Sequence, residues 1–143
     1  MIDDFVRQIY LYDIMAMQKT TIPEFQISTK VVYIPSESKP EEGYHFFAYK
    51  ISITNTGNSP AQLMSRHWTI TDALGKKEEV RGPGVVGMQP KIQPGQTFEY
   101  DSACPLSTNT GSMLGKYYFV AESGESFTVE VPEFYLIAPQ ALH

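Results

Sequence analysis

The stretch of sequence that decides the fold reads Phe47-Ala48-Tyr49-Lys50-Ile51-Ser52-Ile53-Thr54. Large apolar side chains alternate in it with small or polar ones, which is the period of a β-strand with one buried face. A run rich in turn-forming residues follows directly, Asn55-Thr56-Gly57-Asn58-Ser59-Pro60. The two signals together predict a strand that ends in a tight connection.

The same period of two recurs from Phe25 to Val131, and no segment between them has a helical period. It predicts further strands at about 25–33, 61–73, 76–81, 97–101, 113–122 and 127–131. Nine tyrosines, eight phenylalanines, ten prolines and ten glycines also favour strands and tight turns. We therefore predict an all-β fold, an antiparallel sandwich of seven or eight short strands.

Several details within these strands follow from the same alternation. Met64, Trp68 and Ile70 are expected on one face of their strand, with Trp68 in the core of the sandwich. The run 72–75 predicts a hairpin, and the run 105–111 predicts a long polar loop. Prolines at 132 and 139 predict an extended tail after the last strand.

Length, charge and cysteine content exclude several classes of protein. A chain of 143 residues fits one domain, and Cys104 as the single cysteine indicates a reducing cytosol. The net charge of -5 speaks against general nucleic-acid binding and against docking on anionic lipid. No apolar run approaches the ~20 residues of a membrane span, and Asp3 and Asp4 are unlike a signal peptide. We expect a cytoplasmic protein.

The first residues differ from the rest of the chain. Ile2, Phe5, Ile9 and Tyr12 are spaced as on one face of a short helix, although a loosely held extension fits equally well. We therefore assign residues 1–18 to an N-terminal extension and residues 19–143 to the β-sandwich domain.

Gly82, Gly84 and Gly87 form a G-x-G-x-x-G string, the spacing that holds a pyrophosphate in dinucleotide-binding folds. Pro90 follows three residues later, so no helix can begin there and that fold is excluded. Two interpretations stay open. The loop amides can bind an anion together with Arg81, or the glycines supply positive φ angles and a tight crossing between sheets.

The remaining chemistry-bearing residues predict no catalytic, metal or cofactor site. Ser65, His67 and Asp72 lie close in sequence, but they lack a nucleophile elbow and an oxyanion donor pair. His45, His67 and His143 have no ligand spacing, so no metal site is expected.

Aromatic residues cluster in the C-terminal third, at Tyr117, Tyr118, Phe119, Phe134 and Tyr135. They are more numerous than one buried face of a sheet can accommodate, which favours a surface for a protein partner or a homodimer. The alternative is a larger core that the tail packs.

The ordered motifs of the chain resemble the ApaG family from about residue 25 to 136. The resemblance is carried by the run 66–72, Gly75, the run 79–87, Gln89-Pro90, Pro94-Gly95, Phe98, Tyr100, Gly111, Met113, Gly115, Tyr117 and Pro132-Glu133-Phe134. The chain departs from the family at Met88, where an acidic residue is usual, and at Ala103, where glycine is usual. Met88 weakens any scheme that needs a carboxylate in the loop.

The resemblance implies an immunoglobulin-like or fibronectin type III-like sandwich with no established enzymatic activity. Bacterial members are associated with cobalt resistance and magnesium efflux, and related eukaryotic domains are thought to bind proteins. The glycine string of the family has been suggested to bind pyrophosphate or nucleotides, which here concerns Gly82, Gly84 and Gly87. The family name, associated with a diadenosine tetraphosphate hydrolase, suggests dinucleoside polyphosphates as ligands. We expect a non-enzymatic protein-binding module, with a nucleotide or pyrophosphate binder as the alternative.

Overall fold

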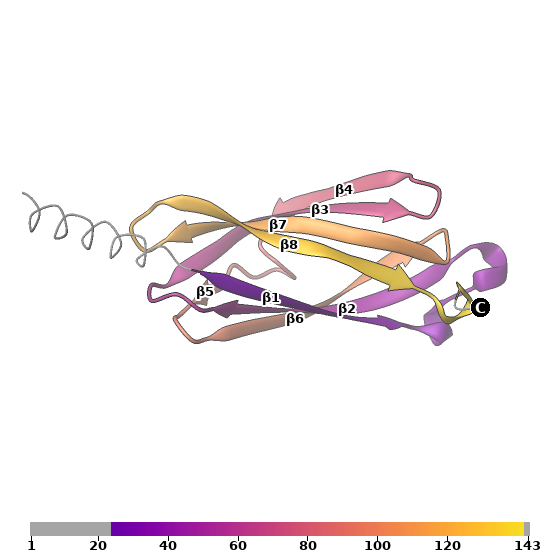
Figure 1. Ribbon diagram of the computed structural model, residues 1–143, viewed down its shortest axis with the longest axis horizontal. Coiled ribbons are helices and arrows are strands. Elements are labelled where there is room, and N and C mark those ends of the chain that lie inside the picture. Colours follow the sequence, from indigo (N-terminus) through magenta and orange to yellow (C-terminus); the bar gives the residue numbers. More distant parts are fainter. Residues whose placement is uncertain (1–23, 142–143) are drawn as a thin grey trace, which may run out of the picture.

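The computed structural model describes residues 24–141, and these form two packed antiparallel sheets (Figure 1). The three-stranded sheet has the order β1-β2-β6, and the larger sheet has the order β4-β3-β7-β8, with β5 also paired to β3. The strands are β1 (Phe25–Tyr33), β2 (His45–Asn55), β3 (Ala61–Asp72), β4 (Lys77–Pro83), β5 (Lys91–Ile92), β6 (Thr97–Leu106), β7 (Thr110–Ala121) and β8 (Ser126–Ile137).

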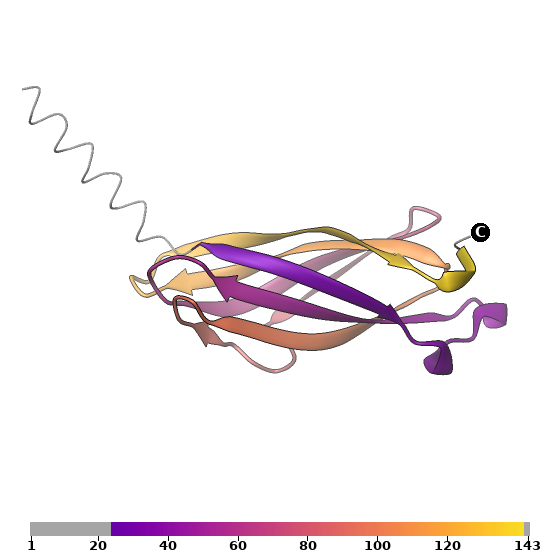
Figure 2. The ribbon, with the colours of Figure 1, turned by 60° about the horizontal axis from the view of Figure 1, so that its bottom comes forward.

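Figure 2 shows the two sheets as separate layers, with β1, β2 and β6 in the lower one. The helical elements within residues 24–141 are three short 3-10 turns, at Pro35–Glu37, Pro40–Glu42 and Pro139–Ala141. The predicted all-β, immunoglobulin-like antiparallel sandwich is therefore confirmed. The predicted extension, residues 1–18, lies outside the described residues.

The alternation in β2 places its large side chains in the core, as predicted. Phe47, Tyr49, Ile51 and Ile53 are buried, whereas Lys50 between them is exposed. Each buried side chain of this kind contributes about 1.5–3 kcal/mol through removal of apolar surface from water. This one strand supplies much of the inner face of the smaller sheet.

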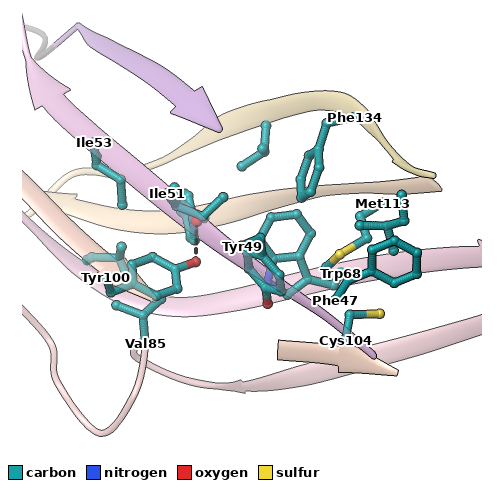
Figure 3. Packing of buried hydrophobic residues seen from close by; sticks show 14 of the residues in the cluster. Phe47, Tyr49, Ile51, Ile53, Trp68, Val85, Tyr100, Cys104, Met113 and Phe134 are labelled. Atoms are coloured by element: carbon teal, nitrogen blue, oxygen red, sulfur yellow. Dashed lines mark hydrogen bonds between the residues drawn. The ribbon is translucent and has the colours of Figure 1, made fainter. Parts of the chain in front are cut away.

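Trp68 of β3 lies in the core, where it packs edge-on against Tyr49, Tyr117 and Phe134 (Figure 3). Its direct neighbour across the β3–β7 ladder is Gly115. A Cβ atom on Gly115 would lie 2.6 Å from the His67 carbonyl oxygen and 2.7 Å from the indole Cε3. The indole ring therefore requires glycine at this position, because any side chain would occupy its space.

One extra residue in β3 overturns part of the predicted face assignment. The β3–β7 register shifts between Leu63 and Ser65, so Met64 is a bulge. Leu63, not Met64, takes the buried position before the bulge, and Trp68 and Ile70 follow on the inner face after it. A bulge cannot be read from alternation alone, because both registers keep a period of two.

The predicted loop at 105–111 and the predicted tail after Pro132 are wrong in extent. Pro105 pairs with Phe46 inside β6, which leaves only residues 107–109 as the connection to β7. β8 continues through Pro132 to Ile137, with a register shift opposite Leu114 that adds one residue to β8. Both prolines lie on strands at the edge of a sheet, where a missing N–H costs no ladder bond.

Asn55 organises the turn that the sequence indicated after β2. It is fully buried, and its Nδ2 donates to the carbonyl oxygens of Ser59 and Ile92 at 2.9 and 3.0 Å. Its Oδ1 accepts from the Gly57 N–H at 2.9 Å. A single polar side chain thus ties the end of β2 to its turn and to β5.

A second polar contact in the core joins the two sheets, between the hydroxyls of Tyr100 in β6 and Tyr117 in β7. The dashed line at Tyr100 in Figure 3 marks this hydrogen bond. Burial raises the pKa of both hydroxyls, and the neighbouring Tyr100 adds to the rise at Tyr117. Both therefore stay protonated in the folded protein.

We expect Tyr100→Phe and Tyr117→Phe each to lower the free energy of unfolding by about 1–3 kcal/mol, since each leaves a buried hydroxyl without its partner. The double variant should be closer to the wild type than the sum of the two losses. Because both folded pKa values are raised, the contribution of the pair is full below about pH 10 and declines as the pH rises above it. Urea denaturation at several pH values measures both effects, and additive losses would contradict the contact.

Candidate functional site

The glycine string begins with Gly82 near the end of β4 and continues into the loop before β5; these two short strands pair with the same side of β3. Two of the three glycines have close neighbours. A Cβ on Gly82 would lie 2.9 Å from Nη1 of Arg66, and a Cβ on Gly84 would lie 2.2 Å from the Met88 carbonyl oxygen. Gly84 and Gly87 have φ angles of 59° and 78°, in the left-handed region that favours glycine.

The loop amides are partly used inside the protein. The Gly84 N–H donates to the Met64 carbonyl oxygen at 2.8 Å, and Val85 and Met88 exchange backbone hydrogen bonds of 2.8 and 2.9 Å. Val86 and Gly87 form the two-residue tip of this small hairpin, and within residues 24–141 their amides have no partner. The Val85 side chain is fully buried beside Tyr100 (Figure 3).

Arg66, not Arg81, is the arginine that holds this loop. Its Nη1 donates to the carbonyl oxygens of Pro83 and Gly84 at 3.1 and 3.0 Å. Arg81 points outward with 67% of its side chain exposed, and its Nη2 lies 4.0 Å from Oε1 of Glu79. Sequence reasoning did not assign Arg66 to the loop, because the guanidinium reaches it across the ladder between β3 and β4.

A cavity of about 420 Å³ opens beside the loop, over β4, β3 and β7. Its lining residues are Ser65, Arg66, His67, Arg81, Gly82, Pro83 and Tyr118. Lys116, His67 and Arg81 are direct neighbours across the three strands and so form a row of basic residues.

Two contacts describe the electrostatics of this row. His67 Nε2 lies 3.1 Å from Oε1 of Glu79, and the Lys116 ammonium lies 5.7 Å from the centre of the Tyr118 ring. Two cationic side chains, an imidazole and an aromatic ring suit a ligand that joins an anionic group to a planar ring. Of the four residues predicted for anion binding, Arg81 and Gly82 line this cavity, whereas Gly84 and Gly87 do not.

The serine, histidine and aspartate of the third strand do not form a catalytic group. Asp72 Oδ1 accepts the N–H groups of Leu74 and Lys76, both at 2.9 Å, and so closes the predicted hairpin. His67 contacts Glu79, and no hydrogen bond within the described range joins His67 to Ser65.

Cys104 is buried, and burial raises the pKa of its thiol to about 11. His45 is buried at the start of β2, and His143 lies outside the described residues. Residues 24–141 contain no group of three His, Cys, Asp or Glu side chains that could hold a metal ion. No helix in that range is long and apolar enough to cross a membrane.

The C-terminal aromatic residues divide between the core and the surface. Tyr117, Phe119 and Phe134 are buried, whereas Tyr135 is 61% exposed and Tyr118 is half-buried in the cavity wall. Leu114 and Ile137 lie on the same outer face as Tyr135 and are also exposed. We call Leu114, Tyr135 and Ile137 the β7–β8 surface.

A family model described as the ApaG domain matches residues 35–121. Protein ApaG of Bdellovibrio bacteriovorus is 84% identical over 127 residues, which cover 89% of this chain and 100% of that protein. Protein ApaG of Acidithiobacillus ferrooxidans is 52% identical over 120 residues, covering 84% of this chain and 94% of that protein. The crystal structure of ApaA from Bordetella pertussis has a TM-score of 0.80 at 48% identity and covers 82% of this chain and 96% of its own.

We expect the glycines of the string to differ in what an alanine costs. Gly84→Ala adds a backbone clash to the cost of a positive φ angle, so it should lower the free energy of unfolding by at least about 3 kcal/mol. Gly87→Ala meets open space and should cost only about 1–2 kcal/mol. Gly124→Ala, also at positive φ in open space, is the matched control outside the loop. Equal losses at all three positions, measured by urea denaturation, would contradict the packing of Gly84.

Proposed function

The chain belongs to the ApaG family, and we propose that it is a non-enzymatic module that binds a protein partner in the cytoplasm. The observation that carries this proposal is the β7–β8 surface. Leu114, Tyr135 and Ile137 expose 42%, 61% and 46% of their surface on one face of the larger sheet. Exposed apolar side chains gathered beside polar ones are typical of protein-binding surfaces.

Tyr135 is the residue that we expect to contribute most to binding. Its hydroxyl donates to Oε1 of Glu133 at 3.0 Å, and Ser112 donates to the other carboxylate oxygen at 3.2 Å. The Glu133 carboxylate also raises the pKa of the Tyr135 hydroxyl, which keeps it protonated as a donor. A tyrosine whose orientation is fixed in this way loses little entropy on binding, and tyrosine is enriched among residues that dominate interfaces.

The family resemblance associates bacterial members with cobalt resistance and magnesium efflux. We propose that this chain takes part in such homeostasis through its protein partner, with the β7–β8 surface as the contact. The cation itself would then be handled by the partner.

Affinity capture from cell extract with Tyr135→Ala tests this proposal. We expect the variant to lose a partner that the wild type enriches, because an interface residue of this kind costs about 2 kcal/mol or more when truncated. Tyr44→Ala is the matched control, since Tyr44 is an exposed tyrosine before β2. A partner retained equally by Tyr135→Ala would count against the surface, and concentration-dependent sedimentation lost in the same variant would identify a homodimer.

A second candidate function is the binding of a nucleotide or pyrophosphate, favoured by the cavity next to the glycine string. Lys116, His67 and Arg81 would meet the phosphate groups, and the Tyr118 ring offers a flat surface to a base. We propose this arrangement in place of a phosphate nest made by all three glycines.

Calorimetry with ATP and with a dinucleoside tetraphosphate, each with and without Mg²⁺, tests the cavity. We expect Arg81→Ala to weaken binding about tenfold or more, since a hydrogen bond to a charged group contributes about 1.5–3 kcal/mol. Lys91→Ala is the control, because Lys91 is a surface lysine paired with Glu122 at 3.0 Å outside the cavity. A bound ligand at a hundred times its Kd should also raise the free energy of unfolding by ~2.7 kcal/mol. Absence of binding by the wild type would eliminate this function.

A further inference from the structure

The outer edge of β6 presents backbone groups that the sandwich does not use. β6 pairs with β2 on one side only, as the border of the three-stranded sheet (Figure 2). The Asn55 N–H donates to the Gln96 carbonyl oxygen at 3.0 Å, which sets the phase of the β2–β6 ladder. Bonded residues alternate in an antiparallel pair, so Phe98, Tyr100, Ser102, Cys104 and Leu106 bond to β2.

The intervening residues of β6 therefore point their N–H and C=O groups away from β2. They are Thr97, Glu99, Asp101 and Ala103, whose backbone groups take no hydrogen-bond partner from residues 24–141. Pro105 occupies the next outward position, where its missing N–H removes no ladder bond. These backbone groups are thus available to pair with a further strand.

A cleft next to this edge has room for a side chain of such a strand. It has a volume of about 220 Å³ and lies between β6 and β4. Val80 and Glu78 line it from β4, Ser102 and Cys104 from β6, and Trp68 from β3. On the opposite side of the sandwich β1 contacts β8, so the opening is confined to the β4–β6 side.

The charges beside the edge specify the added strand. Lys30, Lys50 and Asp101 are direct neighbours across β1, β2 and β6, and Glu99 lies two residues from Asp101 on the same outer face. A strand added next to β6 would place its outward side chains against these two carboxylates. Opposite charges in directly facing pairs stabilise a sheet, so basic residues fit these positions. The alternate side chains would face the cleft, where Trp68, Val80 and Cys104 offer apolar contacts beside the polar Glu78 and Ser102.

We propose that β6 accepts an extended segment of a partner protein in which basic residues alternate with apolar ones. This inference rests on the proposed protein-binding function but uses a surface on the other sheet. A second copy of this chain does not fit the same edge. Antiparallel pairing of β6 with itself about its central residue Tyr100 would bring Asp101 of each copy against Glu99 of the other, and like charges that face each other are destabilising.

Titration of the full chain with a short synthetic peptide that alternates lysine with valine tests the proposal. The matched control peptide alternates glutamate with valine. We expect the lysine peptide to bind, and hydrogen exchange to slow at the amides of Glu99, Asp101 and Ala103. The glutamate peptide should not bind. Slower exchange confined to β1 or β8, or no binding of the lysine peptide, would overturn the proposal.

Two variants distinguish strand pairing at the β6 edge from general electrostatic attraction between the peptide and the protein. Ala103→Pro removes one outward N–H and keeps the bonds to β2, so it should weaken the lysine peptide about tenfold. Asp101→Lys should weaken the lysine peptide and strengthen the glutamate peptide, whereas Glu130→Lys on β8 is the control with the same change of charge. Trp68 fluorescence verifies that each variant is folded.

An equal loss of affinity for the lysine peptide in Asp101→Lys and Glu130→Lys, or unchanged affinity in Ala103→Pro, would overturn strand addition. The proposal would also be overturned if the β6 amides exchanged slowly without peptide and the protein self-associated. That result would identify a second copy of the chain as the occupant of the edge. Tyr135→Ala should leave peptide binding unchanged. A result at β6 can therefore be told apart from the outcome at the β7–β8 surface.

Discussion

The contact between Trp68 and Gly115 is the constraint on which the rest of the sandwich depends. The indole ring fills the centre of the core because the position facing it on β7 has no side chain. That fit fixes the register of β3 against β7, since a slip by one residue would turn every side chain of β3 to the other face. The three aromatic rings around the indole come from both sheets, so the same contact holds the layers together.

The bulge at Met64 connects this core register to the glycine loop through hydrogen bonds. Its carbonyl oxygen accepts the Gly84 N–H, and two residues later Arg66 donates to the loop carbonyls. The glycines accommodate these contacts, Gly82 beneath the guanidinium and Gly84 against the Met88 carbonyl. Of the string that resembles a phosphate-binding motif, packing thus accounts for Gly82 and Gly84, whereas Gly87 lies at the loop tip with open space around it. The cavity beside the string is lined by the basic residues Arg81 and His67.

Two groups of charged residues on the surface of the sandwich bear on its partners. Basic residues form a row across β4, β3 and β7, whereas carboxylates line the outer edge of β6. A small sandwich of this kind can contact an anionic ligand on one sheet and a basic segment on the other, since the core separates the two sites.

The sequence by itself determined the sandwich, the inward face of β2, the hairpin at Asp72 and the central position of Trp68, because alternation and turn chemistry are local properties. It also identified the glycine string and the cluster of C-terminal aromatic residues, although not which of these face outward. Only the tertiary structure decided the bulge at Met64, the role of Arg66 and the extent of β8, since these depend on pairing between residues far apart in sequence. The open edge of β6 likewise follows from strand order, which no local pattern encodes.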